Sequence, residues 1–311
     1  MADGVLNLLK PPGLTSHDAV QEVRRLLGER RVGHTGTLDP GAAGVLVVCC
    51  GEATKAVPFL EEEDAKEYWG EALLGTATHT LDAEGETLQT APEGWTVTAE
   101  QVYAGAARLT GKLEQRVPLV SAVHLAGERL YRLARGGAPV EQPVRRVVVE
   151  RFEIAELLPN EEGRLGTGAR VRFRVTCSRG TYVRSLVDEL GRLLGGFAHL
   201  GFLLRTRSGE FRLEESVTLE ELAEEADPGR RLTPVAEALR YPVLQLGPAE
   251  ARRFCNGAAV PGGSGQPGRR RVFGPAASGG SQGFLGVGEV GPTGILRACR
   301  LFGLGKEPAK R

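Results

Sequence analysis

Residues 32–43 read VGHTGTLDPGAA, and residues 44–50 read GVLVVCC. The first stretch is rich in glycine and holds a proline, which predicts a loop, and the second is a short apolar run, which predicts a buried strand. Functional side chains often lie on a polar loop beside such a strand. Asp39 and His34 in this loop are therefore candidate functional residues. Local pattern alone equally allows an Asx-turn at Asp39.

The residues on either side of this loop predict regular structure. Upstream, residues 5–9 predict a strand and residues 10–13 (KPPG) a turn. A helix capped by Thr15 or Ser16 is expected to follow and to end at Gly28. Downstream we expect a helix from the capping box at residues 98–101 to Gly111, strands over 146–157 and 169–177, and a helix over 182–194.

Three arginines, Arg170, Arg172 and Arg174, alternate with apolar residues in the second of these strands. Alternation places them on one face of a sheet. That face is either solvated or follows a phosphate backbone. The local pattern leaves both readings open.

The C-terminal part changes character at about residue 240, after an acidic patch at 214–227 and Pro234. Strand-like segments occur at 242–246, 284–290 and 294–302 around a Gly-, Ser- and Pro-rich stretch, 257–283. We predict a small β domain with a mobile loop over 257–283. Arg269, Arg270 and Arg271 lie in this predicted loop, where the simplest interpretation is a solvated charge run.

Composition excludes several classes of protein. The chain has 311 residues, 41% of them hydrophobic and 25% charged, so it is long enough for about two globular domains. It shows neither a signal peptide nor a long apolar run, so we expect a cytoplasmic protein without membrane contact. Its five cysteines form no CxxC pair and are odd in number, which predicts reduced thiols rather than disulfides or a zinc ribbon.

The formal net charge is zero, but the charges are unevenly distributed. Residues 61–110 carry 2 basic and 11 acidic side chains, residues 111–212 carry 18 and 11, and residues 241–311 carry 10 and 3. Arginine outnumbers lysine by 33 to 6, and arginine binds phosphate bidentately and stacks on bases. The ratio itself also fits a GC-rich coding sequence, but the uneven placement favours a nucleic-acid partner.

Common enzyme motifs are absent from the sequence. It contains no GxxxxGK[ST], GxSxG or HExxH, and its five histidines share no metal-ligand spacing. These absences disfavour a P-loop NTPase, a serine hydrolase and a zinc enzyme. A glycosidase would need a second carboxylate at a defined distance from Asp39, and the sequence offers none.

Seven spaced motifs follow one another along the chain: Gly4-Val5 with KPxGxTSxD (10–18), GHTGTLDP (33–40), GEATK (51–55), KxY (66–68), DxxG (82–85), CSRGTYVR (177–184) and LRxRSG (204–209). In these motifs and their order the chain resembles the TruB family, the tRNA pseudouridine-55 synthases. The resemblance implies an α+β fold, with a catalytic domain over 1–239 that has a mixed, mainly antiparallel sheet with flanking helices. It also implies an RNA-clamping insertion at about 112–143 and a small β-rich, PUA-like RNA-binding domain over 240–311.

The resemblance further implies an isomerase that converts the uridine at position 55 of the tRNA T-loop to pseudouridine, on a flipped-out base. The partner is the tRNA T-stem-loop. No cofactor, metal or protein partner is required, and a monomer is expected. Two other readings stay open: an RNA-binding factor without turnover, and a guide-dependent synthase, which is disfavoured because partner-binding extensions are missing.

Site residues follow from the motif positions. Asp39 is the nucleophile, either at C6 of uracil or at C1′, and its pKa is expected to be lowered by Arg184. Tyr68 lies against the base and is a candidate for removing the C5 proton, although locally it looks like a strand core residue. The expected RNA-binding residues are His34, Lys10, Asp82, Arg205 and Arg207. Lys10 is expected to hold either the loop or a phosphate, and Asp82 is expected to join the polar network around Arg184.

The insertion departs from the family pattern P-x-x-S-A-x-K-x-x-G-x-x-L-Y-x-x-A-R at two positions. Val120 and His124 stand where tyrosine and lysine are usual. The matching residues are Pro118, Ser121, Ala122, Gly127, Leu130, Tyr131, Ala134 and Arg135. Loss of a stacking ring predicts weaker RNA binding by about 1–3 kcal/mol.

Overall fold

The computed structural model describes residues 2–62, 65–121, 124–125, 128–129, 142–263, 266–275 and 282–302. Nine strands form one large sheet in the order β1-β3-β12-β4-β11-β10-β7, with β13 paired to β12 and β2 paired to β3. These strands are β1 (Gly4–Lys10), β2 (Val32–Thr35), β3 (Ala43–Cys50), β4 (Lys66–Leu74), β7 (Gly111–Arg116), β10 (Val144–Leu158), β11 (Arg170–Cys177), β12 (Ala198–Ser208) and β13 (Phe211–Arg212).

Neighbouring strands in this sheet are antiparallel, apart from the parallel pair β3 and β12. Two short hairpins lie outside it: β5 (Thr76–Thr78) with β6 (Thr87–Thr90), and β8 (His124–Leu125) with β9 (Glu128–Arg129). The prediction of a mixed, mainly antiparallel sheet is confirmed. Residues 112–116, which were expected to begin the insertion, belong to β7 and pair with β10.

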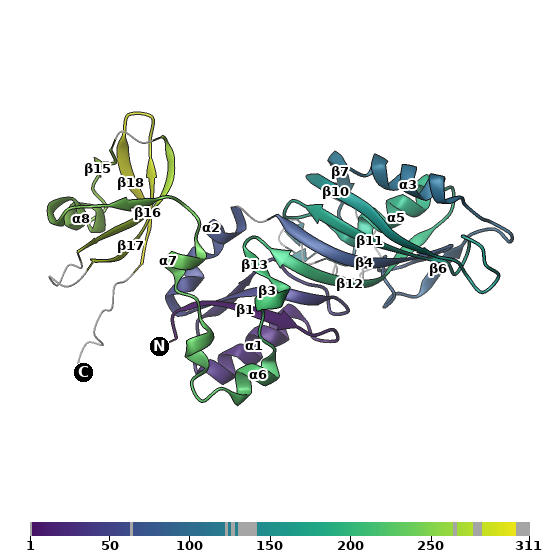
Figure 1. Ribbon diagram of the computed structural model, residues 1–311, viewed down its shortest axis with the longest axis horizontal. Helices are drawn as coiled ribbons and strands as arrows, with labels where there is room; N and C mark the ends of the chain where they lie inside the picture. The colour runs from purple at the N-terminus through teal and green to yellow at the C-terminus, as the bar shows by residue number, and fades with distance from the viewer. Residues whose placement is uncertain are drawn as a thin grey trace.

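Helices flank the sheet in two groups, as Figure 1 shows. α3 and α5 lie over the half that contains β10 and β11, whereas α1 and α6 lie beside β1 at the other end. The helical segments are α1 (Ser16–Leu27), α2 (Val57–Glu62), α3 (Ala99–Arg108), α5 (Val183–Leu193), α6 (Leu219–Glu224), α7 (Val235–Ala238), α8 (Pro248–Cys255), η1 (Gly51–Ala56), η2 (Leu213–Glu215) and η3 (Pro228–Arg231).

Local sequence signals explain the ends of α1. Thr15 accepts a hydrogen bond from the backbone N–H of Asp18, and the Asp18 carboxylate accepts one from the backbone of Thr15, which completes a capping box. Gly28 ends the helix in the left-handed conformation, with φ 61°. The predicted helix from Thr15 or Ser16 to Gly28 is confirmed, and its apolar face joins the main core.

α3 contains Gly105, a residue type that is unfavourable in the interior of a helix. A Cβ on Gly105 would lie 2.8 Å from Leu190 Cδ1. The glycine therefore allows α3 to pack closely against α5. This close approach explains a residue that helix propensity alone disfavours.

The prediction of a loop over 32–43 is only partly correct. Residues 32–35 form β2, which pairs antiparallel with β3 from Val32 opposite Cys50 to Thr35 opposite Val47. Only residues 36–42 connect the two strands. Pairing with the buried strand β3 satisfies the backbone of these four residues despite their glycine content.

A second, five-stranded sheet lies at the C-terminal end of the chain, apart from the large sheet in Figure 1. Its order is β14-β16-β17-β18-β15, and Phe254 of α8 packs in its core. The strands are β14 (Val243–Gln245), β15 (Val260–Pro261), β16 (Gly268–Pro275), β17 (Gln282–Val290) and β18 (Ile295–Leu301). The predicted small β-rich unit is confirmed.

The predicted mobile loop over 257–283 is wrong for most of the residues described there, because it contains β15 and the inner strand β16. Arg269, Arg270 and Arg271 belong to β16 and are not a solvated run. Arg269 pairs with Glu62 at 2.7 Å and stacks over the Phe59 ring, and Arg271 donates to the Tyr241 carbonyl at 2.6 Å. Arg269 therefore joins the small sheet to α2, and Arg271 joins it to the segment that precedes β14.

Two findings concern the described residues as a whole. No helix among them is long and apolar enough to cross a membrane. All five cysteines are free thiols.

The three alternating arginines of β11, Arg170, Arg172 and Arg174, have partners within the protein. Glu71 pairs with both Arg170 and Arg172, and Arg174 stacks over Trp69. This arrangement favours the solvated-face reading of that row.

Candidate active site

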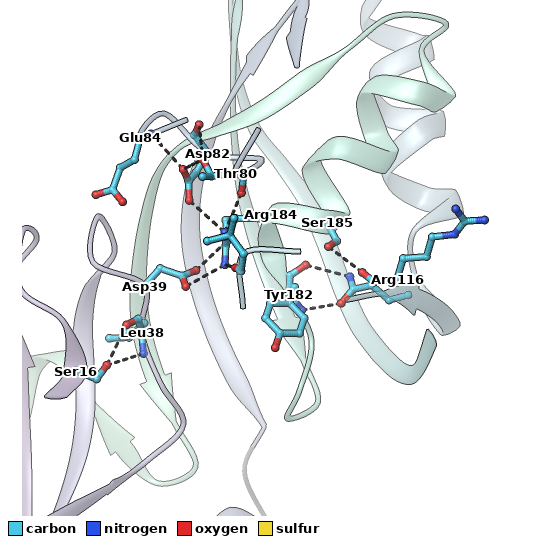
Figure 2. Close-up of polar contacts among 12 residues, drawn as sticks. Ser16, Leu38, Asp39, Thr80, Asp82, Glu84, Arg116, Tyr182, Arg184 and Ser185 are labelled. Atoms are coloured by element: carbon cyan, nitrogen blue, oxygen red, sulfur yellow. Dashed lines mark hydrogen bonds and ion pairs between the residues drawn. The ribbon is translucent and has the colours of Figure 1, made fainter. Parts of the chain in front are cut away.

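The loop between β2 and β3 carries Asp39 and is held from α1 and β1. Ser16 Oγ donates to the Leu38 carbonyl at 3.0 Å and accepts from the Leu38 N–H at 2.9 Å, as Figure 2 shows. The backbone N–H of Gly13 donates to the Pro40 carbonyl at 2.9 Å. The loop is therefore fixed on both sides of Asp39, which presents its side chain in a defined direction.

Lys10 supports the same loop from within the core. Its side chain is fully buried, and Nζ donates to the carbonyls of Pro11 at 2.8 Å, Leu14 at 2.7 Å and Pro40 at 3.3 Å. Burial lowers the pKa of Lys10 to about 8, although the nearby Asp39 carboxylate opposes this change. The prediction that Lys10 contacts RNA is not supported, because the buried ammonium is used on backbone carbonyls. It positions the loop.

The carboxylate of Asp39 meets the guanidinium of Arg184. Arg184 Nη2 donates to Asp39 Oδ1 at 3.0 Å, and Arg184 Nε lies 3.0 Å from Asp39 Oδ2. The Asp39 side chain is 38% exposed, whereas the Arg184 side chain is only 4% exposed. The Asp39 carboxylate thus forms an ion pair with an arginine that is distant in the sequence, and not the Asx-turn that the local pattern allowed.

Arg184 is held by further oxygen atoms around its guanidinium. Nη1 donates to the Thr80 carbonyl at 2.8 Å and lies 3.4 Å from Asp82 Oδ2, and Nη2 also donates to the Val120 carbonyl at 3.2 Å. Arg184 occupies the first turn of α5, whose apolar face packs in the core. The helix and these acceptors together fix the direction in which Arg184 meets Asp39.

Asp82 lies at the start of a tight turn that follows a strained residue. Leu81 has φ 65°, in the left-handed region that a branched apolar side chain rarely adopts. Its carbonyl accepts from the Leu200 N–H at 3.0 Å, which attaches the turn to β12. Asp82 accepts from the backbone N–H of Glu84 at 3.1 Å and from the Thr80 hydroxyl. The predicted link between Asp82 and Arg184 is present as an ion pair.

The pKa of Asp39 departs from its ordinary value in the direction opposite to our expectation. Burial raises it, the Arg184 guanidinium opposes the rise, and the nearby Asp82 carboxylate adds to it. Although 38% of the Asp39 side chain stays exposed, the surrounding protein removes enough water from the carboxylate to outweigh its arginine partner, so the sequence-based expectation of a lowered pKa is wrong.

A cavity of about 450 Å³ opens in front of this ion pair. Tyr68, on β4, is 7% exposed and lines the cavity while also packing in the main core. Tyr68 is therefore a core residue of its strand and also a lining residue of the cavity. Asp39, Tyr68 and Arg184 line one cavity, although they come from three separate parts of the chain.

All five predicted RNA-binding residues, including Lys10 and Asp82, lie outside the set of residues that line this cavity. His34, on β2, is half-buried, and burial lowers its pKa. Arg205 is fully buried and donates to the carbonyls of Val45 at 2.7 Å and Gly36 at 2.9 Å, so a direct RNA contact by Arg205 is not supported. Arg207 pairs with Glu67 at 2.7 Å, which occupies its guanidinium.

Several residues that line the cavity were not predicted as site residues. Lys66 was quoted only as part of a motif, and Ser121 only as a match within the insertion. Arg145, on β10, has no local signal that separates it from other surface arginines. These residues line the cavity with Tyr182, which precedes α5.

Part of the predicted insertion lies outside the described residues: Ala122, Gly127, Leu130, Tyr131, Ala134 and Arg135. The backbone of His124 lies in β8. Val120 contributes its carbonyl to the contact with Arg184. In the part of the chain that the structure describes, no cluster of three or more His, Cys, Asp or Glu side chains could hold a metal ion.

Family models of known proteins match most of the chain. Residues 24–183 match the N-terminal domain of the TruB family pseudouridylate synthases, residues 184–240 match the tRNA pseudouridylate synthase B C-terminal domain, and residues 242–302 match the C-terminal domain of pseudouridine synthase II TruB.

Individual relatives extend this likeness. The tRNA pseudouridine synthase B of Geobacillus kaustophilus is 45% identical over 262 residues, which cover 83% of this chain and 90% of that protein. That of Symbiobacterium thermophilum is 46% identical over 257 residues, 83% of each chain. Among solved structures, a Cbf5-Nop10-Gar1 complex has a chain with TM-score 0.69 and 26% identity, over 97% of this chain and 85% of that one. From these matches, the chain belongs to the TruB family of pseudouridylate synthases.

Proposed function

We propose that this protein is a tRNA pseudouridine synthase that isomerises the T-loop uridine at position 55 of tRNA. The observation that carries the proposal is the Asp39 carboxylate, held by Arg184 at the wall of a cavity that Tyr68 also lines. Relatives with 45% and 46% identity are named tRNA pseudouridine synthase B. Pure RNA binding would not need a carboxylate directed into a cavity, because phosphates repel it.

The reaction balances within the nucleotide. The N1–C1′ bond breaks, the uracil turns, a C5–C1′ bond forms, C5 loses its proton and N1 gains one. Nothing is oxidised or reduced and no group leaves, so the proposed reaction needs no cofactor or metal. Asp39 acts on the reacting base or sugar as a nucleophile, by addition at C6 or by participation at C1′.

The other residues of the cavity have distinct proposed roles. Arg184 orients the Asp39 carboxylate and stabilises its ionised form against burial. Tyr68 lies where a base would stack and is the candidate for taking the C5 proton. Asp82 holds Arg184 through the ion pair at 3.4 Å. These roles require the carboxylate to be ionised when the substrate binds.

The uridine must leave the T-loop stack before it enters this cavity. His34, on β2 beside the catalytic loop, is proposed to steady the extruded nucleotides or fill the space that they leave. Arg145 is exposed at the cavity, where its charge fits a phosphate of the flipped nucleotide. We therefore expect the protein to recognise the phosphates and the shape of the T-loop, and not a linear nucleotide sequence.

The proposal extends to the organisation of the chain. Residues 1–239 would form the catalytic domain, with an RNA-clamping insertion at about 112–143, and residues 240–311 a PUA-like domain that adds RNA affinity. A monomer that acts on tRNA in the cytoplasm without a protein partner is part of the same proposal. Size-exclusion chromatography with and without tRNA tests the oligomeric state.

The test is conversion of uridine to pseudouridine in an unmodified tRNA transcript, read as carbodiimide-dependent primer-extension stops. Asp39→Asn is compared with Asp188→Asn. The Asp188 carboxylate lies outside the cavity lining and pairs with Arg192, with 3.0 Å between Asp188 Oδ2 and Arg192 Nε. We expect wild type and Asp188→Asn to mark the T-loop uridine and Asp39→Asn to bind tRNA without marking it. Binding by wild type without any modification would favour the alternative, an RNA-binding factor without turnover.

A further inference from the structure

Ser121 places a buried hydroxyl group at the wall of the catalytic cavity. The residue is 7% exposed and lines the cavity with Asp39, Tyr68 and Arg184. Its Oγ is fully buried and has no hydrogen-bond partner among the described residues. A buried hydroxyl without a partner destabilises the protein, because it has lost its hydrogen bonds to water and forms none within the protein. A ligand in the cavity can supply the missing partner.

The backbone around Ser121 is fixed on the catalytic residues. The carbonyl of the preceding residue, Val120, accepts from Arg184 Nη2 at 3.2 Å, the same nitrogen that donates to Asp39. Val117 donates through its backbone N–H to the Pro143 carbonyl at 2.9 Å. Ser121 is therefore held at a set distance from the ion pair.

β7, which leads to this segment, is joined to α5 in two further places. Gln115 donates to the Tyr182 carbonyl at 3.0 Å and accepts from the Tyr182 N–H at 2.7 Å. Ser185 Oγ donates to the Arg116 carbonyl at 3.2 Å. The segment before Ser121 and the helix that carries Arg184 thus form one connected unit. A hydroxyl placed in this way is preorganised for a ligand that also contacts Asp39.

A uridine nucleotide offers suitable partners for a serine hydroxyl. The ribose 2′-hydroxyl donates and accepts, and the uracil carbonyls accept. We propose that Ser121 Oγ is a further substrate-contacting group, which hydrogen-bonds an oxygen of the nucleotide that enters the cavity. This inference rests on the proposed function, since it assumes a flipped uridine as the occupant. The ribose and the base are the two sources of that oxygen, and experiment separates them.

The first test compares Ser121→Ala with Ser216→Ala, whose hydroxyl already donates to the Leu213 carbonyl at 2.6 Å outside the cavity lining. For Ser121→Ala we expect kcat/KM on a tRNA transcript to fall about three- to tenfold, the loss typical of one neutral hydrogen bond. Its melting temperature should stay equal to that of wild type or rise, because an unpaired buried hydroxyl is removed. Ser216→Ala should instead lower the melting temperature and leave kcat/KM of the folded enzyme unchanged.

The second test assigns the oxygen. In an Asp39→Asn background, which prevents turnover, the Kd is measured for a transcript with uridine and for one with 2′-deoxyuridine at the target position. If the 2′-hydroxyl is the partner, Ser121→Ala weakens binding of the uridine transcript and leaves that of the deoxyuridine transcript unchanged. If a uracil carbonyl is the partner, both bind more weakly by the same factor.

Two results would overturn the inference: unchanged kcat/KM and Kd for Ser121→Ala, or a lowered melting temperature, which would mark an internal structural hydrogen bond. A wild-type protein that makes no pseudouridine contradicts the proposed function instead. The Kd comparison still decides whether Ser121 contacts the nucleotide in that case.

Discussion

The Asp39 carboxylate and the Arg184 guanidinium meet in two contacts of 3.0 Å, although the residues are 145 positions apart. The loop after β2 supplies the carboxylate and the first turn of α5 supplies the guanidinium. Because α5 packs on the large sheet, any change that moves the helix relative to that loop changes the ion pair. The Asp39 carboxylate, the proposed nucleophile, is thus oriented by the tertiary fold and not by its own loop alone.

Replacement of Arg184 by lysine should separate orientation from charge. One ammonium cannot reach Asp39, Asp82 and the carbonyls of Thr80 and Val120 in the geometry of the planar guanidinium. We expect Arg184→Lys to lower kcat by about 100-fold or more, with little change in the Kd for tRNA. Single-turnover kinetics and filter binding measure the two effects.

Arg192→Lys provides the matched control, because Arg192 lies on the same helix with its side chain 64% exposed and pairs with Asp188. It should change neither constant by more than about twofold, as is usual for surface pairs. Equal losses in both variants would mean that helix stability, and not the contact with Asp39, determines the result.

The raised pKa of Asp39 predicts an acid limb in the pH dependence of kcat. Burial favours the protonated carboxyl, which is not a nucleophile, so the active form appears only as the pH rises through this raised pKa. We expect single-turnover rates to fall with decreasing pH before the ordinary aspartate range is reached. A rate that stays constant until the pH at which the whole protein unfolds would contradict this.

The same pKa shift predicts the sign of a stability change. A group with a pKa raised by folding stabilises the fold most below its unfolded pKa, and this contribution disappears as the pH rises through the folded value. At neutral pH ionised Asp39 therefore destabilises the fold relative to a neutral isostere. Asp39→Asn should melt at or above the wild-type temperature at pH 7, with the difference shrinking toward acid pH. Calorimetry across this range measures it, and a less stable Asp39→Asn at pH 7 would show that the pair with Arg184 outweighs burial.

Lys10 gives a prediction on the alkaline side. Its pKa is lowered by burial to about 8, below its unfolded value, so the folded state binds fewer protons than the unfolded chain between these two values. Stability from this group therefore rises with pH above about 8. In Lys10→Met this pH-dependent gain should be missing, so the melting temperature of wild type relative to Lys10→Met should rise from pH 8 to 10. A constant difference would mean that Lys10 keeps an ordinary pKa.

The sequence predicted much of the fold near the N-terminus because the signals there are local. Thr15, Asp18 and Gly28 define α1 through contacts within a few residues. Asp39 and Arg184 were found through family motifs, since local pattern alone equally allowed a turn at Asp39. Spacing along the chain contains no information on a contact across 145 positions.

The errors in the sequence prediction concern residues whose surroundings come from distant strands. Arg205 was expected on RNA because it is an arginine in a motif, but the parallel pairing of β12 with β3 directs it to the Val45 carbonyl in the core. Arg271 was assigned to a loop from its glycine- and proline-rich neighbours. Pairing of β16 with β14 and β17, which the composition does not reveal, makes that segment an inner strand.

The parallel junction of β3 and β12 leads to a final prediction, at Gly44. Gly44 has φ +115°, and a Cβ there would lie 2.2 Å from the Arg205 carbonyl oxygen. Left-handed strain and overlap with backbone together predict that Gly44→Ala lowers the free energy of unfolding by about 2–5 kcal/mol. Gly195→Ala is the matched control, because Gly195 has φ +72° but nothing within 4 Å of its added Cβ.

Gly195→Ala should cost only the strain, about 1–2 kcal/mol, and leave the activity of the folded enzyme unchanged. In Gly44→Ala the folded fraction should also lose activity, because Arg205 donates to the Gly36 carbonyl at 2.9 Å and so holds the loop that carries Asp39. Urea titration gives the stabilities, and single-turnover rates below the transition give the activity. Equal costs in the two variants would show that strain alone matters and that β3 and β12 can separate without disturbing the site.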